Sequence, residues 1–382
     1  MNNHLNAISA PATIQIADMV RKMTANGEKI AALQTGEPFF PTPQYIKDAL
    51  ADAMKHDQTH YSFSQGIPEL RKSIATYYKS LYSVDINPDQ ILLSCGAIGS
   101  IHAIFTAFIN EGDEIIIIDP AWPQYANIAT MQGAKVNHVS TINTKGRLTP
   151  ALFEKSITAV SKLVVINSPC NPSGVVYSET EINSFITIAK KHGIWLLFDE
   201  VYGELTFTNT FKSVLQCKEY EGYKRNIIYV NSFSKTFAMT GWRIGYAVLP
   251  PTLLSAALKV SQNSITNIST FSQYAAVVAL NDKAKHSEVY TDMLKIYKER
   301  YTQLIVLLQE KKIDFIYPEG AFYFFIKCHM DSIQFAKELL EKEKISVVPG
   351  IGYGKDFSEY YRISYAVDEY SYNQYINWLN RQ

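Results

Sequence analysis

A lysine, an arginine and two serines lie close together in one short segment of this 382-residue chain. Ser232 and Ser234 precede Lys235, and Arg243 lies a few residues further on. A serine hydroxyl and an arginine guanidinium are well suited to bind a phosphate dianion together. The segment therefore predicts a phosphate-binding site with an amine beside it.

Two apolar runs flank this segment and indicate how it is positioned. Residues 227–230 and 244–249 are continuous apolar stretches of the length expected for buried strands. Lys235 follows the end of the first run, and open α/β sheets bind their ligands beyond the carboxyl ends of their strands. Most loop lysines are solvated charges, but this position favours a lysine inside a binding crevice.

The segment resembles the lysine motif of the class I/II aminotransferases, which are fold-type I pyridoxal-phosphate enzymes. The family motif is a serine, two further residues and a lysine, followed eight residues later by an arginine. Ser232, Lys235 and Arg243 match it residue for residue. The resemblance implies that Lys235 forms a Schiff base with pyridoxal 5'-phosphate (PLP), whose phosphate Ser232 and Arg243 hold.

Several other apolar runs also end in polar or glycine-rich clusters. In a parallel sheet these ends share one edge, so the clusters are expected to surround a single crevice. Ordinary turns favour Gly, Pro, Asn and Ser, but they do not require the Trp, the Asp-x-x-Tyr and the Lys found among these residues. The clusters are residues 94–97, 119–122, 167–174, 199–202 and 231–235.

Two of these clusters match further motifs of the same family. Asp199-Glu200-Val201-Tyr202 matches its Asp-Glu-x-Tyr motif, and residues 167–174, NSPCNPSG, match N-x-P-x-N-P-[ST]-G. By resemblance, the Asp199 carboxylate keeps the pyridine nitrogen of PLP protonated, which maintains the ring as an electron sink. Tyr202 and Asn171 are implied to donate hydrogen bonds to the phenolate oxygen of the ring.

The remaining cofactor contacts are also implied by resemblance. Gly96, Ala97 and Ile98 lie just before an expected helix, and backbone N–H groups at a helix N-terminus favour a phosphate. Trp122 matches the aromatic residue that stacks on the cofactor ring. Tyr61 matches a tyrosine that reaches the phosphate bound by the neighbouring subunit, which implies a homodimer with shared active sites.

Substrate contacts follow from the same resemblance. Arg362 matches the arginine that binds the substrate α-carboxylate. A planar guanidinium can donate two parallel hydrogen bonds to the two oxygens of a carboxylate. Gly36 lies in the loop whose backbone meets that carboxylate. Trp122 and Asn171, which contact the cofactor, also border the substrate.

The substrate side chain is expected to be neutral. Some family members that act on acidic substrates have a lysine where this chain has Ala97, so no cation is expected for a second carboxylate. We therefore predict that an aromatic or other neutral donor is used at least as well as aspartate. Contacts to the substrate side chain are expected from the segment around Thr13 to Ile16, from Ala97 and from the partner subunit. Glutamate or 2-oxoglutarate can serve as the second substrate, through a side chain that the sequence does not identify.

The order of apolar and amphipathic segments predicts the fold. Short apolar runs separated by helices indicate a mostly parallel α/β sheet covered by helices on both faces. Residues 46–282 are expected to form this large PLP-binding domain, of the fold-type I transferases. Residues 1–45 and 283–382 are expected to form a smaller α+β domain. The expected helices are residues 44–55, 68–81, 100–109, 180–192, 283–312 and 331–342.

Composition narrows the class of protein. Lys plus Arg and Asp plus Glu both number 36, so the net charge is zero and a nucleic-acid partner is not expected. The four cysteines are widely spaced, which indicates neither a metal site nor a disulfide framework. No signal peptide or membrane-spanning run is evident. These features predict a cytoplasmic enzyme of amino acid metabolism.

The sequence predicts an aminotransferase that moves an amino group between an L-amino acid and a 2-oxo acid. One alternative uses the same cofactor and fold: a PLP-dependent C–S β-lyase or a synthase. The motif Ser-x-x-Lys at Ser232 also occurs in penicillin-binding proteins, but their partner motifs S-D-N and K-T-G are absent from the chain.

Overall fold

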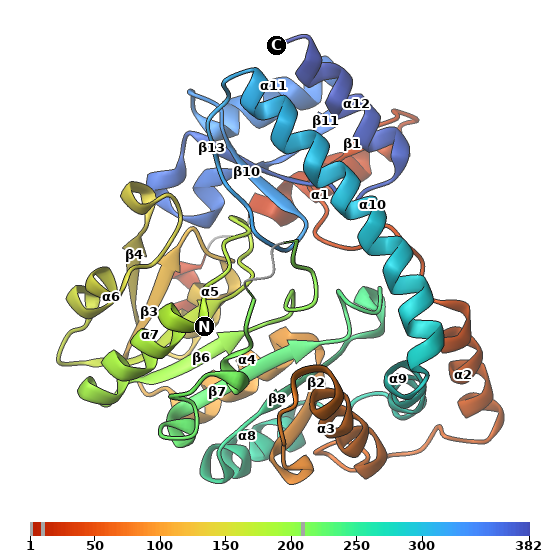
Figure 1. Cartoon of the computed structure of the whole chain (residues 1–382), viewed down its shortest axis with the longest axis vertical. Coiled ribbons are helices and arrows are strands. Elements are labelled where there is room, and N and C mark those ends of the chain that lie inside the picture. The colour runs from red at the N-terminus through yellow and green to blue at the C-terminus, as the bar shows by residue number, and fades with distance from the viewer. Residues whose placement is uncertain (1–2, 9–11, 208–210) are drawn as a thin grey trace.

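The computed structural model describes residues 3–8, 12–207 and 211–382, and a seven-stranded sheet forms its centre (Figure 1). All neighbouring strands pair in parallel except β8, which is antiparallel to β2 and β7. The predicted mostly parallel sheet is thus confirmed. In spatial order the strands are β2 (Ile91–Cys95), β8 (Ile244–Val248), β7 (Ile227–Ser232), β6 (Trp195–Asp199), β5 (Ser161–Asn167), β3 (Glu114–Asp119) and β4 (Lys135–Ser140).

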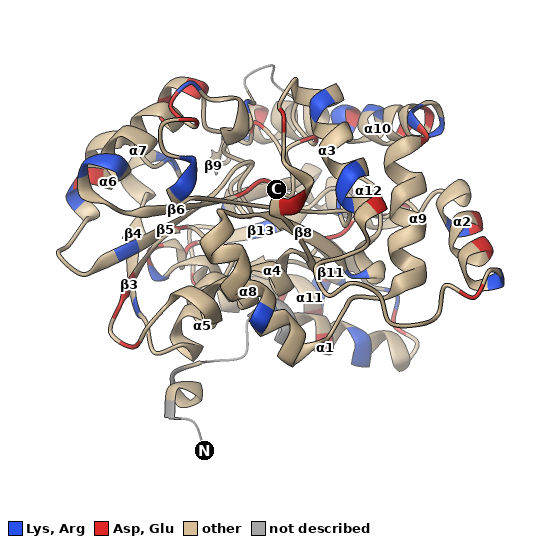
Figure 2. Ribbon diagram, turned by 90° about the horizontal axis from the view of Figure 1, so that it is seen from below, with Lys and Arg blue, Asp and Glu red and all other residues tan. Residues whose placement is uncertain are grey.

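Helices cover both faces of this sheet, as Figure 2 shows in a view turned by 90°. Alternate residues of a strand point to opposite faces, so in β7 Tyr229 packs into one core and Ile228 into the other. The first face is covered by α3 (Pro68–Tyr82), α6 (Pro150–Ser156), α7 (Glu179–His192) and α9 (Thr270–Asn281). The second is covered by α4 (Gly96–Phe108), α5 (Gln124–Met131) and α8 (Pro251–Ser264).

Local sequence signals account for several helix ends. Ser178 and Glu181 form a capping box at the start of α7, and Gly193 ends that helix with φ 71°. The helix predicted at residues 100–109 begins earlier, at Gly96. The prediction placed this start too late because Gly96 and Gly99 are weak helix formers, and the surrounding fold overrides that preference.

Both ends of the chain contribute to a second, smaller unit, at the top of Figure 1. Ala31 and Leu33 share a buried core with residues from the C-terminal third of the chain. The domain boundaries at 45/46 and 282/283 stay a prediction. The small sheets contain β12 (Val348–Pro349), β13 (Tyr360–Ser364), β10 (Tyr323–Lys327) and β9 (Phe315–Ile316), and β1 (Ala31–Ala32) with β11 (Ile345–Ser346). The helices of this part are α1 (Ala12–Ala25), α10 (Lys283–Glu310), α11 (Ser332–Glu343) and α12 (Glu369–Asn380), whereas α2 (Gln44–Lys55) packs against α9 of the large unit.

Charged residues of both signs are interspersed on the outer helices, whereas the central strands are mostly uncharged (Figure 2). The described residues contain no group of His, Cys, Asp and Glu side chains that could hold a metal ion. Among the described helices, none has both the length and the apolar character that crossing a bilayer requires.

The start of α4 lies directly against the backbone of β8. A Cβ atom added to Gly245 would lie 2.3 Å from the carbonyl carbon of Gly96 and 2.4 Å from the amide nitrogen of Ala97. Only a residue without a side chain allows this approach. The contact fixes the first turn of α4 against the strand that follows Arg243.

We expect Gly245→Ala to destabilise the protein by about 1–3 kcal/mol, as overpacking of a filled site typically does. The added methyl group would push β8 away from the first turn of α4, so binding of a phosphate at that turn should also weaken. Thermal unfolding and ligand titration would measure both effects. Gly241→Ala is the matched control, because a Cβ at Gly241 meets nothing within 4 Å. Equal behaviour of the two variants would contradict this account.

Candidate active site

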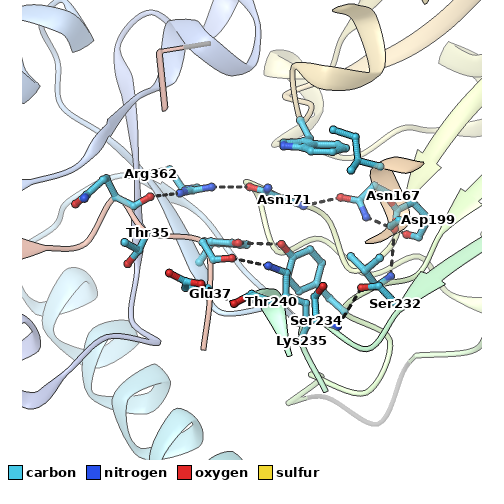
Figure 3. Close-up of a pocket in the computed structure, with 18 of the residues that line it drawn as sticks. Thr35, Glu37, Asn167, Asn171, Asp199, Ser232, Ser234, Lys235, Thr240 and Arg362 are labelled. Carbon is cyan, nitrogen blue, oxygen red and sulfur yellow. Dashed lines mark hydrogen bonds between the residues drawn. The ribbon is translucent and has the colours of Figure 1, made fainter. Parts of the chain in front are cut away.

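A cavity of about 450 Å³ lies where the carboxyl ends of the large sheet's strands face the small unit. Its size is typical of small-molecule sites. Residues from several strand ends line it together with residues of both chain ends (Figure 3). Of the predicted site residues, those that line it are Gly36, Ala97, Ile98, Trp122, Asn171, Asp199, Tyr202, Ser232, Lys235, Arg243 and Arg362.

Lys235 follows β7 and projects across the cavity toward the small unit. Its Nζ donates a hydrogen bond of 2.6 Å to the carbonyl oxygen of Gly36. Loss of water around the ammonium group lowers the pKa of Lys235 from 10.5 to about 8, and nearby Glu37 only partly opposes this shift. About a tenth of the amine is therefore neutral at pH 7, far more than for an exposed lysine, and this form can act as a nucleophile or a base.

Asp199 is a buried carboxylate at the end of β6. Tyr125, on α5, donates a 2.6 Å hydrogen bond to Oδ2, and the backbone N–H of Val201 donates to Oδ1 at 3.2 Å. Burial raises the pKa of Asp199 to about 6, although the bonds from Tyr125 and Val201 act in the opposite direction. The group is mainly ionised at neutral pH and can hold a protonated ring nitrogen.

A chain of side-chain bonds joins Asp199 to the opposite wall of the cavity, as the dashed lines in Figure 3 show. The Asn167 amide donates to the backbone oxygen of Asp199 at 2.9 Å, and its own Oδ1 accepts from the Asn171 backbone N–H at 2.7 Å. Arg362 donates to Asn171 Oδ1 at 3.1 Å. These bonds fix Asn171 between the two units.

Arg362 is a buried cation bonded only to neutral acceptors. Its side chain projects from β13, is 3% exposed, and also donates a 2.6 Å bond to the backbone oxygen of Gln34. The guanidinium lies 4.4 Å from the centre of the Tyr323 ring. Among the described residues, the hydrogen bonds of Arg362 go to neutral oxygens alone, and its Nε has no partner. Such a group is a receptor for an anion, because a buried charge without a counter-ion is costly.

The first turn of α4 forms a cradle at the other end of the cavity. Its N-cap residue, Cys95, makes no side-chain capping bond, and the Gly96 N–H donates to the backbone oxygen of Arg243 at 3.1 Å. The next N–H groups of the turn, those of Ala97 and Ile98, remain available to a ligand. Gly96 has φ 68°, and a Cβ there would lie 2.4 Å from the Arg243 guanidinium. Arg243 and Ser232 line the same region. The uncapped helix start, a guanidinium and a hydroxyl together fit a phosphate group.

Two predicted residues lie off the cavity wall. Gly96 is not among the lining residues, but the close approach of its backbone to Arg243 shapes the cradle. Tyr61 lies in a surface loop, with 88% of its side chain exposed, and borders a different hollow with Phe63. Its assignment to a partner's phosphate stays a prediction.

The carboxylate, the lysine and the cradle fit the ring, the aldehyde and the phosphate of PLP. Consistently, the sequence profile of the family Aminotransferase class I and II matches residues 28–377. The chain belongs to this aminotransferase family. Its fold is the fold-type I architecture, its cofactor is PLP, and it is a transaminase.

Known aminotransferases resemble the chain over nearly its full length. An aspartate aminotransferase from Thermotoga maritima is 33% identical over 368 residues, covering 96% of this chain and 94% of the relative. An asparagine–oxo-acid transaminase from Streptococcus mutans is 32% identical, covering 96% and 94%. The solved structure of Thermus thermophilus aspartate aminotransferase with maleate has a TM-score of 0.94 at 28% identity, covering 100% and 99%.

Sequence motifs missed part of the aminotransferase cavity. Arg21 of α1 also lines the wall, a cation that no sequence motif indicated. Arg21 belongs to no motif, and only its helical spacing from Ala17 gave a signal. The side chains of residues 12–15 lie outside the described part, and Ile16 does not line the cavity. Asn167, Val201 and Ser234 lie in the predicted clusters but had no assigned role. The lining residues outside these clusters that were missed are Ala17, Arg21, Gln34, Thr35, Glu37, Tyr125, Thr240 and Tyr323.

We expect the aminotransferase without its cofactor to attach PLP at a rate that rises with pH to a midpoint near 8. The neutral amine is the reactive form, and the pKa of Lys235 is lowered to about 8, so this form dominates above that pH. Stopped-flow absorbance across a pH series would measure the rate. A midpoint above 10, the range of an exposed lysine, would contradict the desolvation of Lys235.

Proposed function

We propose that Lys235 attaches PLP covalently and moves the proton during amino transfer between an L-amino acid and a 2-oxo acid. The observation that carries this assignment is the place of Lys235, which lines the cavity with Ser232, Arg243 and Arg362 and has its amine on the Gly36 carbonyl, where burial lowers its pKa to about 8. An amine with a pKa near the working pH is both a good nucleophile and a good general base.

The remaining cofactor contacts divide between the ring and the phosphate. Asp199 would hold the ring nitrogen, Tyr202 and Asn171 would donate to the ring oxygen, and Trp122 would cover the ring face. When bound, PLP withdraws electrons from the substrate Cα and so eases loss of its proton. Backbone N–H groups of Ala97 and Ile98, together with Ser232 and Arg243, would hold the phosphate. Gly96 would shape the turn, since its own N–H donates to the backbone oxygen of Arg243.

Arg362 would bind the α-carboxylate of every amino-acid substrate. It is buried, bonded to neutral groups, and held by Asn171 and Gln34, so it is fixed in place before substrate arrives. The backbone of Gly36 lies beside it, since a Cβ at Gly36 would be 3.7 Å from the Arg362 guanidinium. This arrangement would place the substrate Cα near Lys235.

We propose that the enzyme is a homodimer with shared active sites. Tyr61 and Phe63 expose 88% and 64% of their side chains in one surface loop. Aromatic side chains exposed together are typical of a protein interface. In a two-fold dimer each chain would contribute its Tyr61 to the other chain's phosphate cradle.

We also propose a cytoplasmic location. All four cysteines are free thiols, and Cys95 is exposed. Exposed free thiols persist most readily in a reducing compartment. Fractionation of the source cells would test this location.

Lys235→Ala should abolish turnover, because it removes both the attachment point and the base. Borohydride should fix PLP on the unmodified enzyme, and peptide mapping should find the label on Lys235. Lys162→Ala, which changes a lysine outside the cavity, is the control and should retain activity. Product analysis would separate amino transfer from C–S β-lyase chemistry, which releases ammonia and pyruvate. A label on another lysine would refute the assignment.

Tyr61→Phe should weaken PLP binding while leaving a dimer, because it removes only the hydroxyl assigned to the partner's phosphate. Sedimentation would give the oligomeric state, and absorbance titration the cofactor affinity. Tyr317→Phe is a suitable control, since Tyr317 is 51% exposed and lies away from this loop. A fully active monomer would contradict the shared site.

A further inference from the structure

Four cations line the cavity in the described part of the chain: Arg21, Lys235, Arg243 and Arg362. Three of these have proposed roles, at the cofactor aldehyde, its phosphate and the substrate α-carboxylate. We propose that Arg21 binds the distal carboxylate of dicarboxylic substrates and thereby determines substrate preference. This inference rests on the proposed function of the same site.

The helix that carries Arg21 presents one face to the cavity. Ala17 and Arg21 both line the wall, and residues four apart lie on the same side of a helix. Val20, between them in sequence, is 8% exposed and packs into the protein. The small side chain of Ala17 leaves the space beside Arg21 open to a ligand.

Arg21 and Arg362 are positioned by the same unit of the protein. Helix α1 packs against β12, and Val348 of β12 pairs with Arg362 of β13. The elements that carry the two arginines are thus joined through β12, and both side chains line the cavity. A substrate with a carboxylate at each end offers one to each arginine.

The present partner of Arg21 would release it readily. Arg21 donates a 2.6 Å hydrogen bond to Asp18, and the two side chains are 75% and 52% exposed. Exposed ion pairs of this kind contribute little stability. A carboxylate held at its other end by Arg362 would compete well for Arg21, because the second contact is then intramolecular.

No other lining group of the described residues offers a second cation for a distal carboxylate. Ala97 carries no charge, and the lining carboxylates of the described residues are Asp199 and Glu37. Glu37 accepts a 2.6 Å bond from Thr240. Neutral donors would not need Arg21, whose long side chain can remain in water. Arg21 therefore supplies the contact for glutamate or 2-oxoglutarate that the sequence motifs did not identify.

The test compares the unmodified enzyme with Arg21→Ala, Arg21→Lys and Lys22→Ala. Lys22→Ala removes a positive charge from the same helix at a residue that does not line the cavity. Aspartate and phenylalanine serve as donors, with pyruvate as the fixed acceptor so that the second substrate has one carboxylate. Binding of maleate and of propionate to the PLP-loaded protein, measured by calorimetry, provides a readout that does not depend on turnover.

We expect Arg21→Ala to lower the aspartate-to-phenylalanine ratio of kcat/KM by roughly 10- to 100-fold, the loss expected for one charge-assisted hydrogen bond. The change should appear mainly in KM, because the distal carboxylate is bound equally before and during reaction. Maleate binding should weaken by a similar factor and propionate binding should not. Arg21→Lys should restore part of the ratio.

An unchanged ratio in Arg21→Ala would overturn the inference, as would an equal loss in Lys22→Ala. Equal losses for aspartate and phenylalanine would also overturn it, since they would indicate general damage to the site. Failure of the unmodified enzyme to transfer an amino group from any donor would instead contradict the proposed function.

Discussion

The active site depends on taking positive charges out of water and leaving them without a negative partner. Arg362 is buried against Asn171 and a backbone carbonyl, and the Lys235 ammonium donates to a carbonyl of the loop at Gly36. A neutral acceptor compensates such a charge only in part. Loss of water lowers the pKa of Lys235, and it leaves the buried Arg362 guanidinium without a counter-ion. The same bonds connect the walls of the cavity, so one set of contacts both shapes the site and gives it affinity for anions.

The parallel sheet makes this arrangement possible because it brings distant residues to one edge. Asn171 follows β5, Asp199 ends β6 and Lys235 follows β7, and these three strands are adjacent in the sheet. The antiparallel strand β8 returns the chain so that Arg243 faces the start of α4. The backbones of α4 and β8 are in direct contact at Gly96 and Gly245, which leaves the first turn of α4 little freedom to move. The small unit supplies Arg362 and the Gly36 loop from the opposite side.

Residues in motifs could be predicted from the sequence, because their chemistry and spacing are both constrained. The ends of the apolar runs identified Lys235, Asp199 and Asn171, and the structure brings all three to one cavity. β4 was not predicted, because it is an edge strand whose exposed polar residues interrupt any apolar run. Arg21 and Tyr125 were missed for a different reason: each reaches the cavity through the packing of a helix. No local pattern encodes that packing.

Helix α1 has a distinctive place in the chain, since it lies outside the segment, residues 28–377, that matches the family profile. It nevertheless forms part of the cavity wall. Changes in this helix alter the wall without touching the residues assigned to the cofactor. Preference for a substrate and competence in catalysis can therefore diverge independently during evolution. Exchange of a short N-terminal stretch between relatives, by recombination or by design, becomes a direct route to new donors on an unchanged catalytic frame.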